Sequence, residues 1–272
     1  MESSPCRPNK ISGRSMSVKV RIINSSLGPD ECIQFAQTIL INDEIAIDAG
    51  TLGLITPLRT QQDIKHVFLS HSHLDHVATL PLFLDNVYKP GDDCPTVYGT
   101  SETLASLHTD FFNDRVWPDL FRLSKEETPF LRQQKLSSQE PIKIDNLSIT
   151  PVLLNHVVPT MGFIIQEATT TLAIISDTLP TVQVWKLLNE VQNLSALFLE
   201  CSFPNRMQWL ADKAGHLTPQ RFQSELAKLN NFNIPVYAIH IKATYHEEVI
   251  RELQELKIRE LHISPPNLEI TI

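Results

Sequence analysis

The stretch HVFLSHSHLDHVATL constrains the fold of this chain most, because it packs four histidines and one aspartate into an otherwise apolar segment. His71 and His73 are two residues apart, so in an extended segment their side chains point to the same side. If a helix begins just after them, Asp75 and His76 lie in its first turn and face a second position nearby. One short motif can therefore supply ligands to two adjacent metal ions. Pro81 predicts a kink or an early end of that helix.

Six apolar runs end in a side chain that can bind a metal or move a proton. Loops that leave strand ends build the sites of layered α/β proteins, so we expect these ends to converge. The six terminal residues are Asp48, His71, His156, Asp177, Glu200 and His240. Each alone is an ordinary residue at the end of a strand. Beside the histidine cluster, however, His156, Asp177 and His240 are natural candidates to complete two metal sites, ideally with one bridging carboxylate.

The donor atoms in this pattern are imidazole nitrogen and carboxylate oxygen. Such donors without thiolate suit zinc, with manganese or iron as alternatives. The four cysteines form no CxxC pair, which argues against a disulfide framework or a cysteine zinc knuckle. Four other histidines have no ligand-like partners in the sequence and are assigned to structure or surface: His66, His108, His246 and His262.

Short Val- and Ile-rich runs alternate with amphipathic stretches, which predicts an α/β (α+β) arrangement of strands and helices. Helical spacing occurs in residues 104–111, 222–229 and 250–256, and Thr218-Pro219 is typical of a helix start. We expect residues 1–16 to form a flexible tail and residues 17–272 to form a single domain.

Charge and hydropathy limit the partners and the location. The chain has 31 acidic and 23 basic residues, a formal net charge of −8, whereas proteins that grip a long polyanion usually carry a basic patch. No long nucleic acid is therefore expected, although a metal cluster can still attract a small anion locally. The apolar runs are far shorter than the roughly 20 residues of a membrane span, and the N-terminus lacks an apolar signal core. We therefore expect no membrane partner and a cytoplasmic location.

The motif HSHLDH, followed by a distant His, an Asp and a His, resembles the metallo-β-lactamase superfamily, and the match runs from Asp48 to His240. The resemblance implies a four-layer αβ/βα sandwich with two mixed β-sheets and a site at the edge between them. It also implies two divalent metal ions, with zinc expected. One ion would be held by His71, His73 and His156, the second by Asp75, His76 and His240, and both by a bridging Asp177. Asp48 would orient the ligands from behind.

Within the superfamily, the segments NHVVPTMGFII, LECSFPNR, AGHLTP and IHIK resemble the class II 3′,5′-cyclic nucleotide phosphodiesterases. That resemblance implies hydrolysis of cyclic AMP, cyclic GMP or both to nucleoside 5′-monophosphates, by a hydroxide that two metal ions activate and that Asp177 and Asp75 help to place. The chain departs from the family signature at Ala78-Thr79 and Pro81, where a small Gly or Ser and aliphatic residues are usual. The sequence does not choose the base, the metal or the oligomeric state, and a homodimer is compatible with it.

Glu200 and His216 occupy positions similar to a paired acid and histidine in the related tRNA 3′-processing enzymes. A carboxylate beside an imidazole favours its charged, proton-donating form, so His216 is a candidate to protonate a departing oxygen. The plainer alternative is that Glu200 ends a strand and His216 lies in the loop before a helix. Lys242 is a weak candidate for a phosphate contact, since a lone lysine is more often solvated.

Three other functions remain open. A tRNA 3′-end endonuclease would share the site but needs a basic surface and a Gly/Pro-rich arm, whereas this chain has 8 glycines and a negative charge. A thioester or lactam hydrolase gives no reason for LECSF and AGHLTP. The third is a binding protein that keeps the fold without catalysis, and the complete ligand set argues against it. The aromatic-rich segment 110–139 is open to three interpretations: a cover over the site, a dimer contact or ordinary core.

Overall fold

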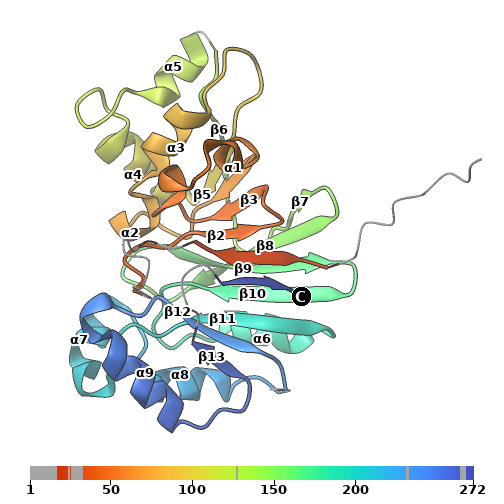
Figure 1. The fold of residues 1–272 in the computed structure, drawn as a ribbon, viewed down its shortest axis with the longest axis vertical. Helices are drawn as coiled ribbons and strands as arrows, with labels where there is room; N and C mark the ends of the chain where they lie inside the picture. The colour runs from red at the N-terminus through yellow and green to blue at the C-terminus, as the bar shows by residue number, and fades with distance from the viewer. Residues whose placement is uncertain (1–16, 24, 26–32, 127, 231–232, 264–267) are drawn as a thin grey trace, which may run out of the picture.

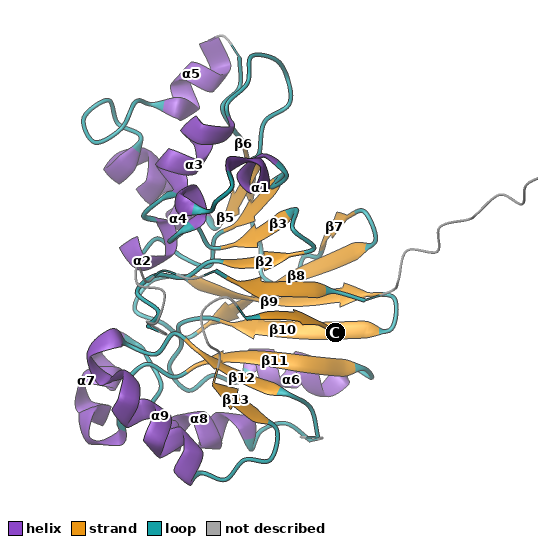
Figure 2. Ribbon diagram, viewed as in Figure 1, coloured by secondary structure: helices purple, strands orange, loops and turns teal. Residues whose placement is uncertain are grey.

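Two β-sheets of seven strands lie face to face, and helices cover the outer face of each (Figures 1 and 2). The computed structural model describes residues 17–23, 25, 33–126, 128–230, 233–263 and 268–272. The tail predicted for residues 1–16 lies outside these described residues. No helix among the described residues is long and apolar enough to cross a membrane.

The first sheet is antiparallel at one side and parallel at the other. Its strands β14 to β3 run antiparallel to their neighbours, and β3 to β6 run parallel. In spatial order they are β14 (Glu269–Thr271), β1 (Lys19–Ile22), β2 (Ile39–Ile41), β3 (Ile45–Ile47), β4 (His66–Phe68), β5 (Thr96–Gly99) and β6 (Arg132–Lys135).

The second sheet is mixed in the same way. Strands β7 to β10 are antiparallel neighbours, and β10 to β13 run parallel. In spatial order they are β13 (Leu261–Ile263), β12 (Val236–Ile239), β11 (Leu194–Glu200), β10 (Thr170–Ile175), β9 (Thr160–Glu167), β8 (Leu147–Leu154) and β7 (Ile142–Ile144).

Three hydrophobic cores separate the four layers. The central core lies between the sheets and includes Phe68 and Phe163, and the outer cores lie between each sheet and its helices. The helices of the first sheet are α1 (Leu58–Gln62), α2 (Leu74–Val77), α3 (Leu80–Val87), α4 (Ser101–Ser106) and α5 (Leu120–Glu126). Those beyond the second sheet are α6 (Gln183–Glu190), α7 (Gln208–Ala214), α8 (Pro219–Leu226) and α9 (His246–Glu255). The predicted four-layer α+β sandwich with two mixed sheets is confirmed.

Local predictions hold at most points. The helix after the motif breaks as expected, because α2 ends at Val77 and α3 begins at Leu80 with Pro81 in its first turn. Helix α8 begins at Pro219 after Thr218, although the Thr218 hydroxyl donates to Gln208 and does not cap the helix.

The aromatic-rich segment is mostly ordinary core. Phe112 and Phe121 are buried beneath the helices of the first sheet, and Phe111, Trp117 and Phe130 pack partly buried against the same core. The predicted helix over residues 104–111 is split, since α4 is followed by a short π-helix, Leu107–Phe111.

Candidate metal centre

The site lies where parallel strands of the two sheets end. The carboxyl ends of parallel neighbours meet at one edge of a sheet, as those of β3 and β4 do in the first sheet and those of β10, β11 and β12 in the second. Strand β8 is antiparallel to β9 and so runs in the same direction as β10, and the six predicted residues lie at the carboxyl ends of these six strands. Two of them, Asp48 and His240, have a left-handed backbone, with φ of 62° and 58°. Such conformations are uncommon for residues other than glycine and concentrate at functional sites.

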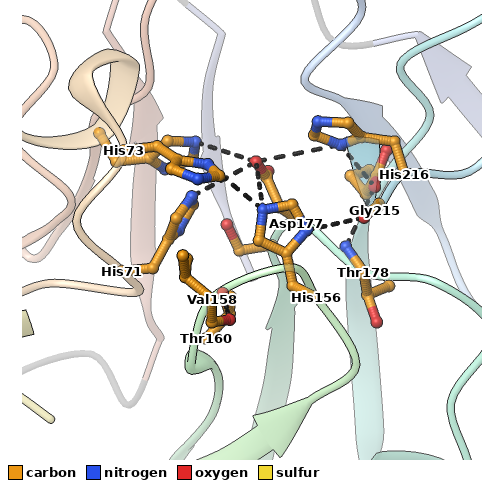
Figure 3. Close-up of polar contacts among 12 residues, drawn as sticks. His71, His73, His156, Val158, Thr160, Asp177, Thr178, Gly215 and His216 are labelled. Carbon is orange, nitrogen blue, oxygen red and sulfur yellow. Dashed lines mark hydrogen bonds and ion pairs between the residues drawn. The ribbon is translucent and has the colours of Figure 1, made fainter. Parts of the chain in front are cut away.

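A first cluster of ligand atoms forms around His71, His73, His156 and Asp177. Figure 3 shows the three imidazole rings gathered beside the carboxylate of Asp177. Nε2 of His71 lies 3.6 Å, and Nε2 of His156 lies 3.9 Å, from Oδ2 of Asp177. Nδ1 of His73 faces Nε2 of His156 at 3.3 Å. The extended segment before α2 thus presents both of its histidines to one point, as their spacing predicted.

A second cluster contains Asp75, His76 and His240. Nε2 of His240 is 3.2 Å from Oδ2 of Asp75 and 3.2 Å from Nε2 of His76. Asp177 reaches this cluster as well, with Oδ2 3.3 Å from Nε2 of His76 and Oδ1 3.5 Å from Nε2 of His240. The carboxylate of Asp177 therefore lies between the two clusters.

Fixed partners on the outer side of the rings orient four of the imidazoles. A hydrogen on Nδ1 leaves Nε2 with a lone pair that points into the site. The outward contacts of Nδ1 are Ser70 Oγ for His71 at 2.9 Å, Asp48 Oδ2 for His76 at 2.7 Å, the Gly215 carbonyl for His156 at 2.8 Å, and Ser202 Oγ for His240 at 2.9 Å. Asp48 thus lies behind the ring of His76, and its role in orienting metal ligands stays a prediction.

The chemistry of the clusters fits a divalent cation. Nε2 of His71 and Oδ1 of Asp177 are buried and have no hydrogen-bond partner among the described residues. Burial lowers the pKa of His71 well below its ordinary value, and it also lowers the pKa of His73 and of His156, so these rings are neutral as metal ligands must be. Burial opposes ionisation of Asp177, yet His240 and His76 hold the pKa of Asp177 well below its usual range.

The second cluster contains charged groups of both signs. Burial opposes a charged His76, but the carboxylates of Asp177 and Asp48 raise the pKa of His76 well above its ordinary value. Burial also opposes ionisation of Asp75, and the hydrogen bond from His240 nevertheless lowers the pKa of Asp75. Lys242 lies at the rim, with Nζ 3.1 Å from Oδ2 of Asp75, so it contacts an acidic member of the cluster.

Glu200 and His216 form a buried pair beside Asp177. Nδ1 of His216 lies 3.0 Å from Oε1 of Glu200 and 3.9 Å from Oδ2 of Asp177. Burial disfavours the charged ring, but the Glu200 carboxylate overcomes it and raises the pKa of His216. The same oxygen of Glu200 accepts hydrogen bonds from the backbone N–H groups of Thr178 and Leu217, both at 3.1 Å.

The structure brings together all the residues predicted for the metal clusters and for the acid–histidine pair. The four histidines assigned elsewhere lie outside the clusters found in the described part of the chain. His66, for example, contacts the Tyr98 hydroxyl, and His108 pairs with Asp119.

Sequence reasoning missed three supports of the ligands: Ser70, Ser202 and the carbonyl of Gly215. The signal was present but weak, since each is a neighbour, or a near neighbour, of a predicted site residue in LSHSH, LECS and AGH.

Comparison with known proteins places these observations in a family. The model of the beta-lactamase superfamily domain matches residues 43–241. A probable 3′,5′-cyclic-nucleotide phosphodiesterase of Yersinia pestis is 28% identical over 251 residues, which cover 79% of this chain and 70% of the relative.

Two solved structures share the fold. Unliganded yeast PDE1 has a TM-score of 0.73 and 19% identity, and the match covers 91% of this chain and 97% of the yeast chain. The short form of human tRNase Z has a TM-score of 0.64 and 18% identity, and the match covers 93% and 98% of the two chains. The family model spans well over half of the sequence, so the chain belongs to the beta-lactamase superfamily, as its HSHLDH motif predicted.

Proposed function

We propose that this protein is a metal-dependent phosphodiesterase that hydrolyses 3′,5′-cyclic nucleotides to nucleoside 5′-monophosphates. The observation that carries the proposal is the position of Asp177 between two clusters of inward-facing imidazoles, beside the buried Glu200–His216 pair. The Yersinia relative is named for the same activity and shares 28% of its aligned residues. A binuclear centre with a nearby proton donor meets the two main requirements of phosphodiester hydrolysis.

Two divalent ions, zinc by the nature of the donors, would occupy the clusters. His71, His73 and His156 would hold one, Asp75, His76 and His240 the other, and Asp177 both. When bound, such ions activate water and neutralise phosphoryl oxygens. The neutral imidazoles of His71, His73 and His156 and the ionised carboxylate of Asp177 already have the protonation states that a bound ion requires, whereas the charged ring of His76 would lose a proton when the ion binds.

The protein's own groups would handle the leaving oxygen and the phosphate. Water adds to phosphorus and gives up a proton to solvent, the bond from phosphorus to the ribose 3′-oxygen breaks, and His216 gives that oxygen its proton and regains one from solvent. Nδ1 of His216 is held by Glu200, which leaves Nε2 as the donating atom. Asp177 and Asp75 orient the attacking water. Lys242, at the rim beside Asp75, would contact a phosphate oxygen.

A tRNA 3′-end endonuclease is the second candidate. The acid–histidine pair and the fold shared with human tRNase Z favour it. The excess of 31 acidic over 23 basic residues speaks against it, because a long polyanion is gripped mainly through positive charge. A thioester or lactam hydrolase would use the same clusters but leaves the buried Glu200–His216 pair without a purpose.

The test is hydrolysis of cyclic AMP, cyclic GMP and a precursor tRNA by purified protein, with products separated by chromatography and a chelator-treated sample in parallel. Metal-dependent release of 5′-monophosphate is expected. Asp177→Ala should lose bound metal and nearly all turnover while keeping the fold, whereas Asp110→Ala, at an exposed residue that belongs to neither cluster, should match the native protein. Cleavage of tRNA without cyclic nucleotide turnover, in protein that contains metal, would reject the proposed substrate.

A further inference from the structure

Each half of the site is supported by a buried serine that contacts one strand-end carboxylate and two imidazoles. In the first sheet, the hydroxyl of Ser70 lies 2.8 Å from Oδ2 of Asp48. It also lies 2.9 Å from Nδ1 of His71 and 3.4 Å from Nδ1 of His76. Ser70 is fully buried, so solvent does not replace any of these contacts.

The second sheet repeats the arrangement with Ser202. Its hydroxyl lies 2.9 Å from Oε2 of Glu200, 2.9 Å from Nδ1 of His240 and 3.3 Å from Nδ1 of His216. The backbone carbonyl of His240 is a further contact at 2.8 Å. Ser202 is also fully buried. The proposed catalytic pair and a proposed metal ligand therefore share one hydroxyl group.

The hydrogen-bonding capacity of a hydroxyl fixes the direction of these contacts. A serine has one proton to donate and two lone pairs that accept. The Ser202 proton goes to one of its two oxygen neighbours, Oε2 of Glu200 or the His240 carbonyl. The short contact with Nδ1 of His240 is then a bond in which the ring donates. A proton on Nδ1 alone leaves Nε2 of His240, the atom that faces Asp75 and Asp177, with a lone pair for an ion, which would replace the hydrogen bond that Nε2 gives to Asp75 without the ion.

The two serines differ in what they hold. Ser70 contacts His71 of the first cluster and, at longer range, His76 of the second. Ser202 contacts only His240 among the seven proposed ligands, and its second imidazole is His216. Loss of the Ser202 hydroxyl should therefore affect one metal position, whereas loss of the Ser70 hydroxyl should affect the first cluster directly.

We propose that Ser202 is a positioning residue that holds His240 in its metal-binding tautomer and ties this ligand to the proton donor His216. The inference rests on the proposed two-metal site. Ser202 would increase the affinity for the ion held by Asp75, His76 and His240. Ser70 and Gly215 would increase the affinity for the other ion. Outer partners of metal-binding histidines typically contribute about 10- to 100-fold in metal affinity.

The experiment is a titration of the chelator-stripped protein with Zn²⁺ against a chromophoric competitor, which resolves two stepwise dissociation constants. Ser202→Ala should weaken one of the two about 10- to 100-fold and leave the other unchanged. Ser70→Ala should weaken the binding of the ion whose dissociation constant Ser202→Ala leaves unchanged. Ser195→Ala is the matched control, because the hydroxyl of Ser195 contacts only the Asn193 carbonyl among the described residues.

A spectroscopic readout separates positioning from general loosening of the fold. In zinc-loaded native protein, the ¹⁵N signals of His240 should report a proton on Nδ1, and Ser202→Ala should shift or broaden these signals while the signals of His71 stay in place. If Ser202→Ala does not fold, Ser202→Cys, which replaces the hydroxyl by a weak acceptor, is measured in the same way.

The outcomes distinguish this inference from the function on which it rests. Native protein that binds fewer than two ions would overturn the two-metal site itself. Native protein that binds two ions, with both dissociation constants unchanged in the Ser202 variant, would leave the proposed function standing and overturn the role of Ser202. Equal weakening of both ions by Ser202→Ala would also overturn it.

Discussion

Replacing His216 by alanine tests the assignment of the proton donor. His216 is 5% exposed, it is held by Glu200 at 3.0 Å, and it does not belong to the seven proposed ligands. A positioned general acid contributes about 10²- to 10⁴-fold to the rate, which corresponds to about 3 to 5 kcal/mol in the barrier. We therefore expect His216→Ala to lower kcat for cyclic AMP by that factor while both metal ions remain bound.

The leaving group makes the same variant more informative. The ribose 3′-oxygen is a poor leaving group and needs a proton, whereas a nitrophenolate departs without one. His216→Ala should therefore lose far less activity on bis(p-nitrophenyl) phosphate than on cyclic AMP. The assay compares kcat for both substrates at equal metal content. Equal losses on the two substrates would refute proton donation, and a loss of bound metal would identify His216 as a ligand, since its ring also lies near Asp177 and His240.

Three further variants test the charges and the packing around the site. Burial disfavours the charged form of His216 and Glu200 stabilises it, so Glu200→Gln should lower the pKa of His216. A proton donor is active only below its pKa. The alkaline limb of the plot of kcat against pH should therefore move to lower pH. Glu225→Ala removes a buried carboxylate that accepts hydrogen bonds from an indole and a backbone N–H, and should cost about 1 to 3 kcal/mol in denaturant unfolding for each donor that it leaves without a partner. Gly215→Ala should weaken zinc binding, because its Cβ would overlap Nδ1 of His156 at a position with φ of 84°.

Matched substitutions give these results a reference. Glu190→Ala, at the exposed end of α6, should change the unfolding free energy by no more than about 0.5 kcal/mol. Gly91→Ala also places alanine at a positive φ, 130°, but its Cβ would meet nothing within 4 Å, so it should strain the backbone without affecting zinc binding. A kcat profile in Glu200→Gln that keeps its alkaline limb would contradict the coupling of Glu200 to His216. Equal zinc affinity in Gly215→Ala and Gly91→Ala would show that overlap of the new Cβ with His156 does not affect zinc binding.

The residues that meet in the two clusters could be selected from the sequence, because histidines and aspartates are chemically distinctive among apolar runs; their role as metal ligands stays a prediction. Asp177 and His240 are 63 residues apart in number, yet each follows a strand of one parallel group, and the edge of that group brings them together. Of the partners behind the rings, Asp48 was predicted, whereas Ser70, Ser202 and the carbonyl of Gly215 were not. Neither a serine hydroxyl nor the carbonyl of Gly215 has a distinctive sequence signature. The role of such a group depends on an imidazole from a distant segment that contacts it in the folded chain, as His240 contacts Ser202.

The same support also explains how two strained residues are kept in place. A left-handed backbone at a residue other than glycine costs about 1 to 3 kcal/mol and persists only where neighbouring groups determine it. At His240, Ser202 contacts both the ring nitrogen and the backbone carbonyl, and so fixes the strained backbone together with the ring. At Asp48, the backbone N–H donates to the Phe68 carbonyl while the side chain binds the backbone N–H and the hydroxyl of Ser70. Ser70 thus stabilises the left-handed backbone of Asp48, and Ser202 that of His240, through contacts that also orient imidazole rings of the site. The unfavourable backbone conformations therefore occur at the residues whose contacts set the orientation of these rings.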